Sequence, residues 1–185
     1  MKPKKTSDRL SKSKGMEEII VVLHNIRSLH NVGSIFRTAD GAGIKKIYVC
    51  GITPTPLDRF NKLIPQFAKV ALGAEKNIEW VKLKSTVSAI KDLKKQGFKI
   101  IAIEQSKKSI PYFKYQDKNK KIALVLGNEI KGVPQSILRE VDKILEIPMH
   151  GKKESLNVTI AFGIVICRLL YPSPFKDKSL RNQKS

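Results

Sequence analysis

The sequence has no long apolar run. None of its 185 residues lies in a stretch that approaches the ~20 consecutive apolar residues of a membrane-spanning helix. The N-terminus is basic, but it lacks the apolar run and small-residue cleavage site of a signal peptide. We therefore expect no membrane association and a cytoplasmic location.

Cysteine and histidine are also scarce. The two cysteines, Cys50 and Cys167, each follow residues rich in Ile and Val, which predicts buried, reduced thiols. They and the three histidines, His24, His30 and His150, do not have the spacing of a zinc site. We therefore predict no metal site.

The common glycine-rich cofactor loops are missing as well. Gly127 and Gly132 have the spacing of a P-loop, but Val133 stands where a lysine would have to reach the phosphates. Gly41 and Gly43 follow a helical stretch and lack the third glycine of a dinucleotide-binding fingerprint. These absences exclude the two commonest nucleotide-binding loops.

Acidic residues are few, since 16 Asp and Glu stand against 36 Lys and Arg, giving a net charge of +20. Residues 1–15 carry six basic residues and one acid, and residues 172–185 carry four and one. We interpret both segments as basic, disordered tails. The part between them keeps +12, which indicates a polyanionic partner, most simply nucleic acid, with membrane lipid the weaker alternative.

Short apolar runs alternate with helical stretches between the tails. The runs are rich in Ile and Val without polar alternation, as in strands covered on both faces. We predict strands at Ile19–His24, Lys46–Cys50, Phe98–Ile103, Ile122–Leu126 and Ile144–Ile147. We predict helices at about 32–41, 85–96, 134–141 and 157–171. This alternation predicts a single α/β domain with a mostly parallel sheet flanked by helices.

Residues 104–121 form the most polar stretch inside the predicted domain. Six lysines, Lys107 and Lys108 among them, alternate here with three aromatic residues: Tyr112, Phe113 and Tyr115. Such a mixture suits RNA, with cations on phosphates and rings on bases. The alternative is an ordinary solvated loop whose aromatic side chains pack onto the core.

Three polar segments follow or extend predicted strands: residues 25–40, 122–132 and 145–157. Polar side chains at the carboxyl ends of parallel strands lie where α/β sheets bind ligands. Each segment also has a purely structural interpretation. The first is a capped helix with a surface arginine, the second is a glycine-bounded turn, and the third supplies Ser155 or Asn157 as a helix N-cap.

Taken together and in this order, the three segments resemble the SpoU/TrmH branch of the SPOUT RNA methyltransferases. The first resembles the family's Asn…Arg motif, here Asn31 and Arg37. The second resembles its Gly-x-Glu turn, here Gly127 and Glu129. The third resembles its Ile-Pro-Met…Ser-Leu-Asn-Val motif, here Ile147–Met149 and Ser155–Val158. The resemblance covers residues 17–171.

The resemblance implies a SPOUT methyltransferase domain over residues 16–171, with a C-terminal trefoil knot that strand patterns alone cannot predict. It implies that S-adenosylmethionine binds in this knot and that the protein is a homodimer with an active site shared across the interface. The residues that match the family's cofactor-binding positions are Leu126, Gly127, Ile147, Met149, Ser155 and Leu156.

The implied reaction is methyl transfer to a ribose 2′-hydroxyl of RNA. Arg37 would activate or orient the hydroxyl, and Asn31 would position Arg37 or the ribose. Glu129 would hold the second-motif loop or Arg37 by a charge-assisted hydrogen bond. Ser155 and Asn157 would bind the cofactor and the target phosphate. Four further residues are predicted to contact RNA: Arg27, His30, Lys107 and Lys108.

Many such relatives carry a separate N-terminal RNA-binding domain, whereas about 15 residues precede the first predicted strand here. We therefore expect the tails, residues 104–121 and a partner subunit to capture RNA, and we favour tRNA over ribosomal RNA. Two alternatives remain open: an RNA-binding protein that has lost catalysis, and a SPOUT enzyme that methylates a base.

Overall fold

The computed structural model describes residues 18–116 and 121–171. The two predicted basic tails, 1–15 and 172–185, lie outside these residues, and so do residues 117–120 of the lysine-rich segment.

A parallel sheet of seven strands forms the centre of the described structure. The strands lie in the order β3-β2-β1-β6-β4-β7-β5, and each neighbouring pair is parallel. Their bounds are β1 (Glu18–His24), β2 (Lys46–Cys50), β3 (Glu79–Leu83), β4 (Lys99–Ile103), β5 (Ile110–Pro111), β6 (Lys121–Leu126) and β7 (Lys143–Glu146). The five predicted strands match β1, β2, β4, β6 and β7 with ends within one residue. The α/β architecture with a parallel sheet is therefore confirmed.

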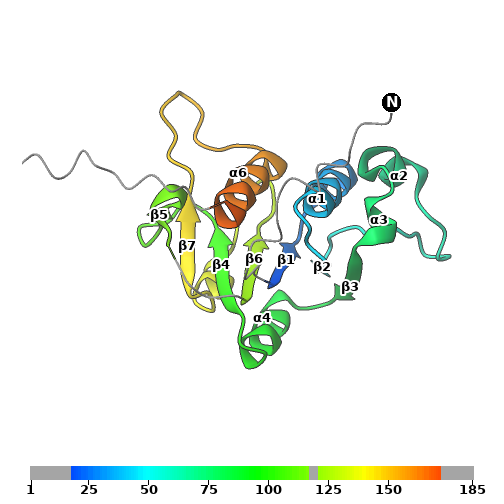
Figure 1. The fold of residues 1–185 in the computed structure, drawn as a ribbon, viewed down its shortest axis with the longest axis horizontal. Helices are drawn as coiled ribbons and strands as arrows, with labels where there is room; N and C mark the ends of the chain where they lie inside the picture. Colours follow the sequence, from blue (N-terminus) through cyan, green and yellow to red (C-terminus); the bar gives the residue numbers. More distant parts are fainter. Residues whose placement is uncertain (1–17, 117–120, 172–185) are drawn as a thin grey trace, which may run out of the picture.

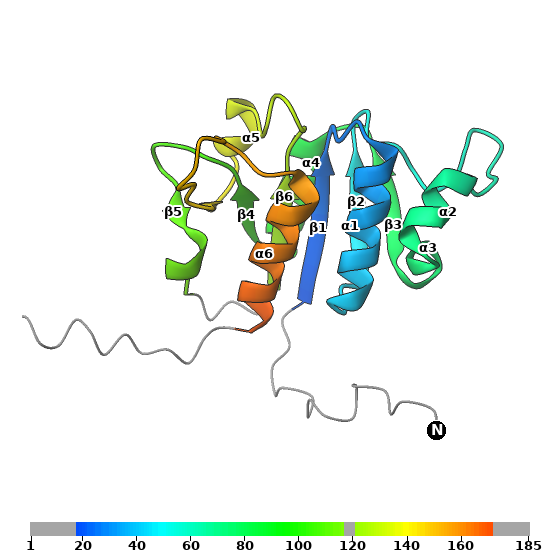
Figure 2. The same cartoon turned by 90° about the horizontal axis from the view of Figure 1, so that it is seen from above.

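Helices cover both faces of the sheet (Figure 1). Their bounds are α1 (Leu29–Gly41), α2 (Pro65–Ala71), α3 (Ala74–Asn77), α4 (Thr86–Lys95), α5 (Gln135–Leu138) and α6 (Val158–Leu170), with a short 3-10 helix η2 (Tyr112–Lys114). On one face α1 and α6 lie side by side, and α4 and α5 lie on the opposite face (Figure 2).

Burial on both faces explains why the central strands lack polar alternation. Along β1, Val21 and Leu23 pack in the apolar cluster under α1 and α6, whereas Ile20 and Val22 pack in the cluster under α4. Successive side chains of a strand point to opposite faces, so a strand between two helical layers must be apolar at every position.

Two helices have an end that differs from the prediction by more than one residue. Helix α1 begins at Leu29 and not near Val32, because Ser28 is its N-cap and its hydroxyl accepts a hydrogen bond from Asn31 N at 3.2 Å. Asn31 therefore lies inside the first turn and not near the cap. Helix α5 is shorter than the predicted 134–141, and Pro134 precedes it in an extended conformation.

The segment between β2 and α4 contains elements that the sequence did not predict. Strand β3 is an edge strand whose side chains are half-buried or exposed, so it lacks the apolar run of the central strands. Helix α2 packs closely on α1 at Gly33, where a Cβ would lie 3.1 Å from Val70 Cβ. The rings of Phe36 and Phe67 meet edge to face at 5.2 Å in the same contact.

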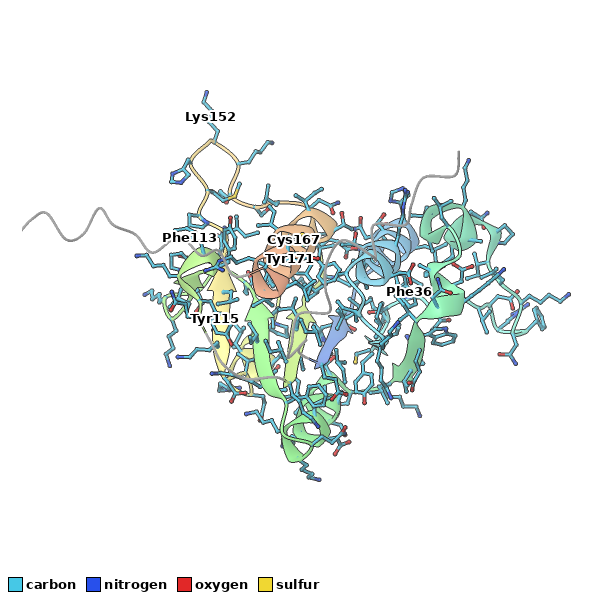
Figure 3. The ribbon with its side chains drawn as sticks, in the orientation of Figure 1. Phe36, Phe113, Tyr115, Lys152, Cys167 and Tyr171 are labelled. Carbon is cyan, nitrogen blue, oxygen red and sulfur yellow. The ribbon has the colours of Figure 1, made fainter. Side chains whose placement is uncertain are left out.

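The prediction for the cysteines is half right. Cys50 is fully buried, and burial raises the pKa of its thiol, so the neutral form is favoured. The prediction of a buried Cys167 is wrong, because this residue lies on an outward side of α6 (Figure 3). The apolar sequence of α6 extends around the helix, while the sheet covers only one side of it.

Candidate active site at the carboxyl edge of the sheet

A cavity of about 710 Å³ lies where β4, β6 and β7 end. The loops that follow these strands line it, together with the first turn of α6. All residues assigned to cofactor binding from the family motifs line this cavity: Leu126, Gly127, Ile147, Met149, Ser155 and Leu156. The carboxyl edge of a parallel sheet thus brings together residues that are 30 positions apart in sequence.

The predicted catalytic residues divide into two groups. Asn31, Glu129, Ser155 and Asn157 line the same cavity. Arg37 is not among the residues that line it, and its side chain is exposed on α1. Six positions along a helix turn a side chain about 120° away, so Asn31 and Arg37 occupy different sides of α1.

Glu129 connects the loop after β6 to the start of α1. Its carboxylate accepts hydrogen bonds from Arg27 N at 2.9 Å, Ser28 N at 3.0 Å and the Asn31 amide at 3.0 Å. Partial burial would raise the pKa of Glu129, but these three donors outweigh it and hold that pKa below its ordinary value of 4.5. In this structure the partner of Glu129 is the beginning of the first motif and not Arg37.

Asn157 connects the third motif to the first. Its side-chain oxygen accepts a hydrogen bond from Thr159 N at 2.8 Å and so caps α6. Its amide nitrogen donates to Asn31 Oδ1 at 3.3 Å. Glu129, Asn31 and Asn157 therefore form one hydrogen-bonded chain that joins the three motifs at the cavity.

The loop after β6 folds back on itself and requires glycine at two positions. Asn128 and Gly132 exchange backbone hydrogen bonds of 3.1 and 2.9 Å. A Cβ at Gly127 would lie 2.4 Å from the Gly132 carbonyl carbon, so any other residue at this position would clash with the backbone. Gly132 has φ +61, in the region that favours glycine. The two glycines thus fix the shape of this wall of the cavity.

Glu104 is a site residue that the sequence did not identify. It follows β4 at the carboxyl edge and lines the cavity. One carboxylate oxygen accepts a hydrogen bond from Val133 N at 2.6 Å and the other from Gln105 N at 2.9 Å. The sequence feature that could have identified Glu104 is its position as an acid directly after an apolar strand. Its hydrogen bond with Val133 N depends on the tertiary structure and could not be predicted.

Glu104→Ala should loosen the loop after β6, because Val133 N loses its acceptor. We expect the Kd for S-adenosylmethionine to rise about 5- to 10-fold, which corresponds to the loss of one hydrogen bond of about 1–1.4 kcal/mol. Glu104→Gln keeps an acceptor for Val133 N and should change this Kd by less than about threefold. Calorimetry with both variants checks this, and equal losses in the two would show that the charge matters and not the hydrogen bond.

The four predicted RNA contacts, Arg27, His30, Lys107 and Lys108, are all exposed. In the lysine-rich segment, Tyr115 is buried and Tyr112 packs half-buried against the core, as the alternative of a packed loop expects. Phe113, which Figure 3 labels, is 49% exposed. Its ring meets the ring of Tyr112 edge to face. Of the three aromatic residues, Phe113 is therefore the one placed to meet a partner.

Residues 18–116 and 121–171 contain neither a metal-binding cluster nor a membrane-spanning helix. These residues contain no group of three or more His, Cys, Asp or Glu side chains placed to hold a metal ion. They also contain no helix of the length and apolarity that crossing a membrane requires.

Comparison with known proteins adds a family match. The model of the SpoU rRNA Methylase family matches residues 18–167. A tRNA (guanosine(18)-2′-O)-methyltransferase of Aquifex aeolicus is 33% identical over 83% of this chain and 69% of its own length. The 23S rRNA (guanosine-2′-O-)-methyltransferase RlmB of Neisseria meningitidis is 28% identical over 90% of this chain and 61% of its own length.

The solved structures show the same fold. An AdoMet-bound rRNA methyltransferase from Sinorhizobium meliloti superposes with a TM-score of 0.73 at 30% identity, over 82% of this chain and 56% of that one. The chain therefore spans about three fifths of the length of this enzyme and of the Neisseria relative.

Proposed function

Because the chain belongs to the SpoU rRNA Methylase family, we propose that it transfers a methyl group from S-adenosylmethionine to a ribose 2′-hydroxyl of RNA. The observation that carries this proposal is the convergence of the three motifs. Glu129, Asn31 and Asn157 join them in one hydrogen-bonded chain at a single cavity.

The cavity fits the cofactor in size and lining. Its volume of about 710 Å³ lies within the range of roughly 300–1,000 Å³ that is typical of small-molecule sites. Backbone and side chains of Leu126, Gly127, Ile147, Met149, Ser155 and Leu156 would hold the cofactor. When bound, S-adenosylmethionine supplies an electrophilic methyl group on a sulfonium.

The chain's own residues would orient the ribose and stabilise its charge. Holding the hydroxyl in line with the methyl group removes up to about 7–11 kcal/mol of the barrier. A guanidinium stays protonated at neutral pH and is a poor base, so Arg37 would orient the hydroxyl and stabilise its alkoxide. An RNA phosphate would then serve as the proton relay. Asn31 and Glu129 fix the start of the helix that carries Arg37.

A homodimer is part of the proposal, and the outer side of α6 supports it. Ile160, Ile164, Cys167 and Tyr171 recur at intervals of three and four residues, so they form one stripe along the helix. Ile160 is 54% and Tyr171 62% exposed. Contact between two such stripes would bury them. The family resemblance implies an active site shared across the interface, and Arg37 is exposed on α1, which neighbours α6. The trefoil knot is likewise expected from the family.

Ile160→Ala should weaken this dimer, because burying the side chain of Ile160 contributes to association from both subunits. We expect the dimer dissociation constant to rise about tenfold in sedimentation equilibrium. Leu72→Ala is the matched control, since Leu72 is 63% exposed on a different surface. An unchanged association for Ile160→Ala would place the interface elsewhere.

The proposed substrate is tRNA, and a direct assay tests both this choice and the reaction. The support is the 33% identity to an enzyme named for tRNA, against 28% to one named for 23S rRNA. Transfer of tritiated methyl groups to unmodified tRNA and to ribosomal RNA, followed by mass spectrometry of the nucleosides, identifies the product. Binding without incorporation would favour an RNA-binding protein without catalysis, and a methylated base would favour the other SPOUT branches.

A further inference from the structure

The connection from β2 to α2 ends in a projecting turn that the catalytic proposal does not use. It extends outward beyond α2, at the β3 end of the sheet (Figure 2). The outer part of this turn, residues 58–62, has the sequence Asp-Arg-Phe-Asn-Lys, and we name it the 58–62 tip. Phe60 is 65% exposed there, between two cationic residues, Arg59 and Lys62.

The 58–62 tip is held in shape by hydrogen bonds from Asp58. Its carboxylate oxygen accepts from Phe60 N at 2.8 Å and from Lys62 N at 2.9 Å, and Asp58 N donates to Lys62 O at 2.9 Å. Leu57 and Leu63 pair as an antiparallel bridge directly below the tip. The exposed ring is therefore presented on a preorganised turn, which reduces the entropy lost when a ligand binds.

The base of the same connection is fixed to the first motif. Thr53 is fully buried, and its hydroxyl accepts from Ile26 N at 3.0 Å and donates to Cys50 O at 2.8 Å. Asn25 Oδ1 accepts from Ile52 N at 3.0 Å. The segment that leads to the tip and the loop that leads to α1 are thus held together.

The chemistry of the 58–62 tip suits nucleic acid more than protein. The Arg59 guanidinium lies 4.7 Å from the centre of the Phe60 ring, a cation–π contact. Every other side chain of the tip is polar, and beside it Leu63 is 38% exposed, so the apolar surface around Phe60 is small compared with the patches that protein interfaces bury. A lone ring between cations matches RNA, whose unpaired bases stack on aromatics while its phosphates meet Lys and Arg.

We infer that the 58–62 tip is a second RNA contact, at which Phe60 stacks on an unpaired base and Arg59 and Lys62 contact phosphates. The inference rests on the proposed function in that it takes RNA as the partner. The tip lies at the β3 end of the sheet, four strand spacings or roughly 20 Å from β4 at the cavity. It would therefore read a nucleotide several positions away from the methylated ribose.

The test measures RNA binding by the full chain with Phe60→Ala. The probes are a labelled 20-nucleotide single-stranded oligouridine and a 20-base-pair RNA duplex. Loss of one base–aromatic stack should weaken single-strand binding about 5- to 20-fold. Duplex binding should change by less than about twofold, since paired bases are not available to stack. Leu72→Ala removes another exposed apolar side chain and should leave both affinities unchanged.

A second variant gives a direct signal of stacking. Phe60→Trp should keep the wild-type affinity, and its fluorescence should be quenched by the single strand beyond the change seen for Trp80 in the wild type. Unchanged single-strand affinity in Phe60→Ala, or no added quenching in Phe60→Trp, would overturn the inference. A changed sedimentation coefficient of Phe60→Ala without RNA would overturn it in favour of a protein interface.

The proposed function is tested separately, by methyl transfer in the wild-type protein. Absence of transfer to both tRNA and ribosomal RNA would refute the proposed function. The RNA affinity of Phe60→Ala and the fluorescence quenching of Phe60→Trp would still decide whether the 58–62 tip binds RNA.

Discussion

Replacing Arg37 with alanine should lower kcat for methyl transfer by about 10²- to 10³-fold, the cost of removing one donor that stabilises a developing oxyanion. The Kd for S-adenosylmethionine should stay within about threefold, because Arg37 does not line the cavity. Single-turnover transfer of tritiated methyl groups gives the rate, and calorimetry gives the Kd. Loss of cofactor binding in this variant would assign Arg37 a structural role.

Two further variants separate charge, geometry and surface effects at Arg37. Arg37→Lys keeps the charge but loses the planar fork of donors, so most of the rate should still be lost. Near-full activity in Arg37→Lys would contradict a role that depends on the guanidinium. Lys91→Ala removes an exposed cation from α4, on the opposite face of the sheet, and should leave kcat unchanged.

The sequence predicted the strands that two layers of helices cover, because such strands must be apolar throughout. The bounds predicted for Lys46–Cys50 were those of β2. Strand β3 was missed since an edge strand carries polar side chains such as Glu79 and Lys82. The predicted start of α1 was wrong because Val32 is the first fully buried apolar residue of the helix. The helix in fact begins three residues earlier, at Leu29, because Ser28 is its N-cap.

The position of the site was predictable for a related reason. Parallel strands end at one edge, so motifs that follow them converge there whatever their separation in sequence. The pairing inside the site was not predictable in the same way. The contacts of Glu129 with Arg27 and Ser28, and of Glu104 with Val133, depend on how loops pack after the sheet has formed. These contacts carry no sequence periodicity.

Glu129→Ala should lower kcat/KM for methyl transfer about 10- to 100-fold. The substitution removes the acceptor of three donors, and a hydrogen bond to a charged group contributes about 1.5–3 kcal/mol. The loop that lines the cavity and the start of α1 would then lose their link, so both cofactor binding and the position of Arg37 should suffer. Glu129→Gln keeps one good acceptor and should give an intermediate loss.

The control for Glu129 is Glu79, an exposed carboxylate that forms an ion pair and does not link two motifs. Glu79 forms an ion pair with Lys46 at 2.7 Å on the edge of the sheet, far from the cavity. Glu79→Gln should therefore leave kcat/KM within about twofold. If Glu129→Ala were as mild as this control, the hydrogen-bonded chain through Asn31 would have no part in catalysis.

The acid dependence of folding gives an independent readout of the same contacts. The pKa of Glu129 lies below its ordinary value of 4.5 in the folded chain, because three donors favour the carboxylate over the opposing effect of burial. A lowered folded-state pKa adds stability that is fully present above pH 4.5 and is lost as pH falls through the folded-state pKa.

The difference in unfolding free energy between the wild type and Glu129→Gln should therefore be constant from pH 7 to about pH 5 and shrink below it. Denaturant titrations across this range measure the difference. If this difference did not change with pH, the charge of Glu129 would contribute nothing to stability. The link between the first and second motifs would then depend on the hydrogen-bonding geometry of the side chain and not on its charge.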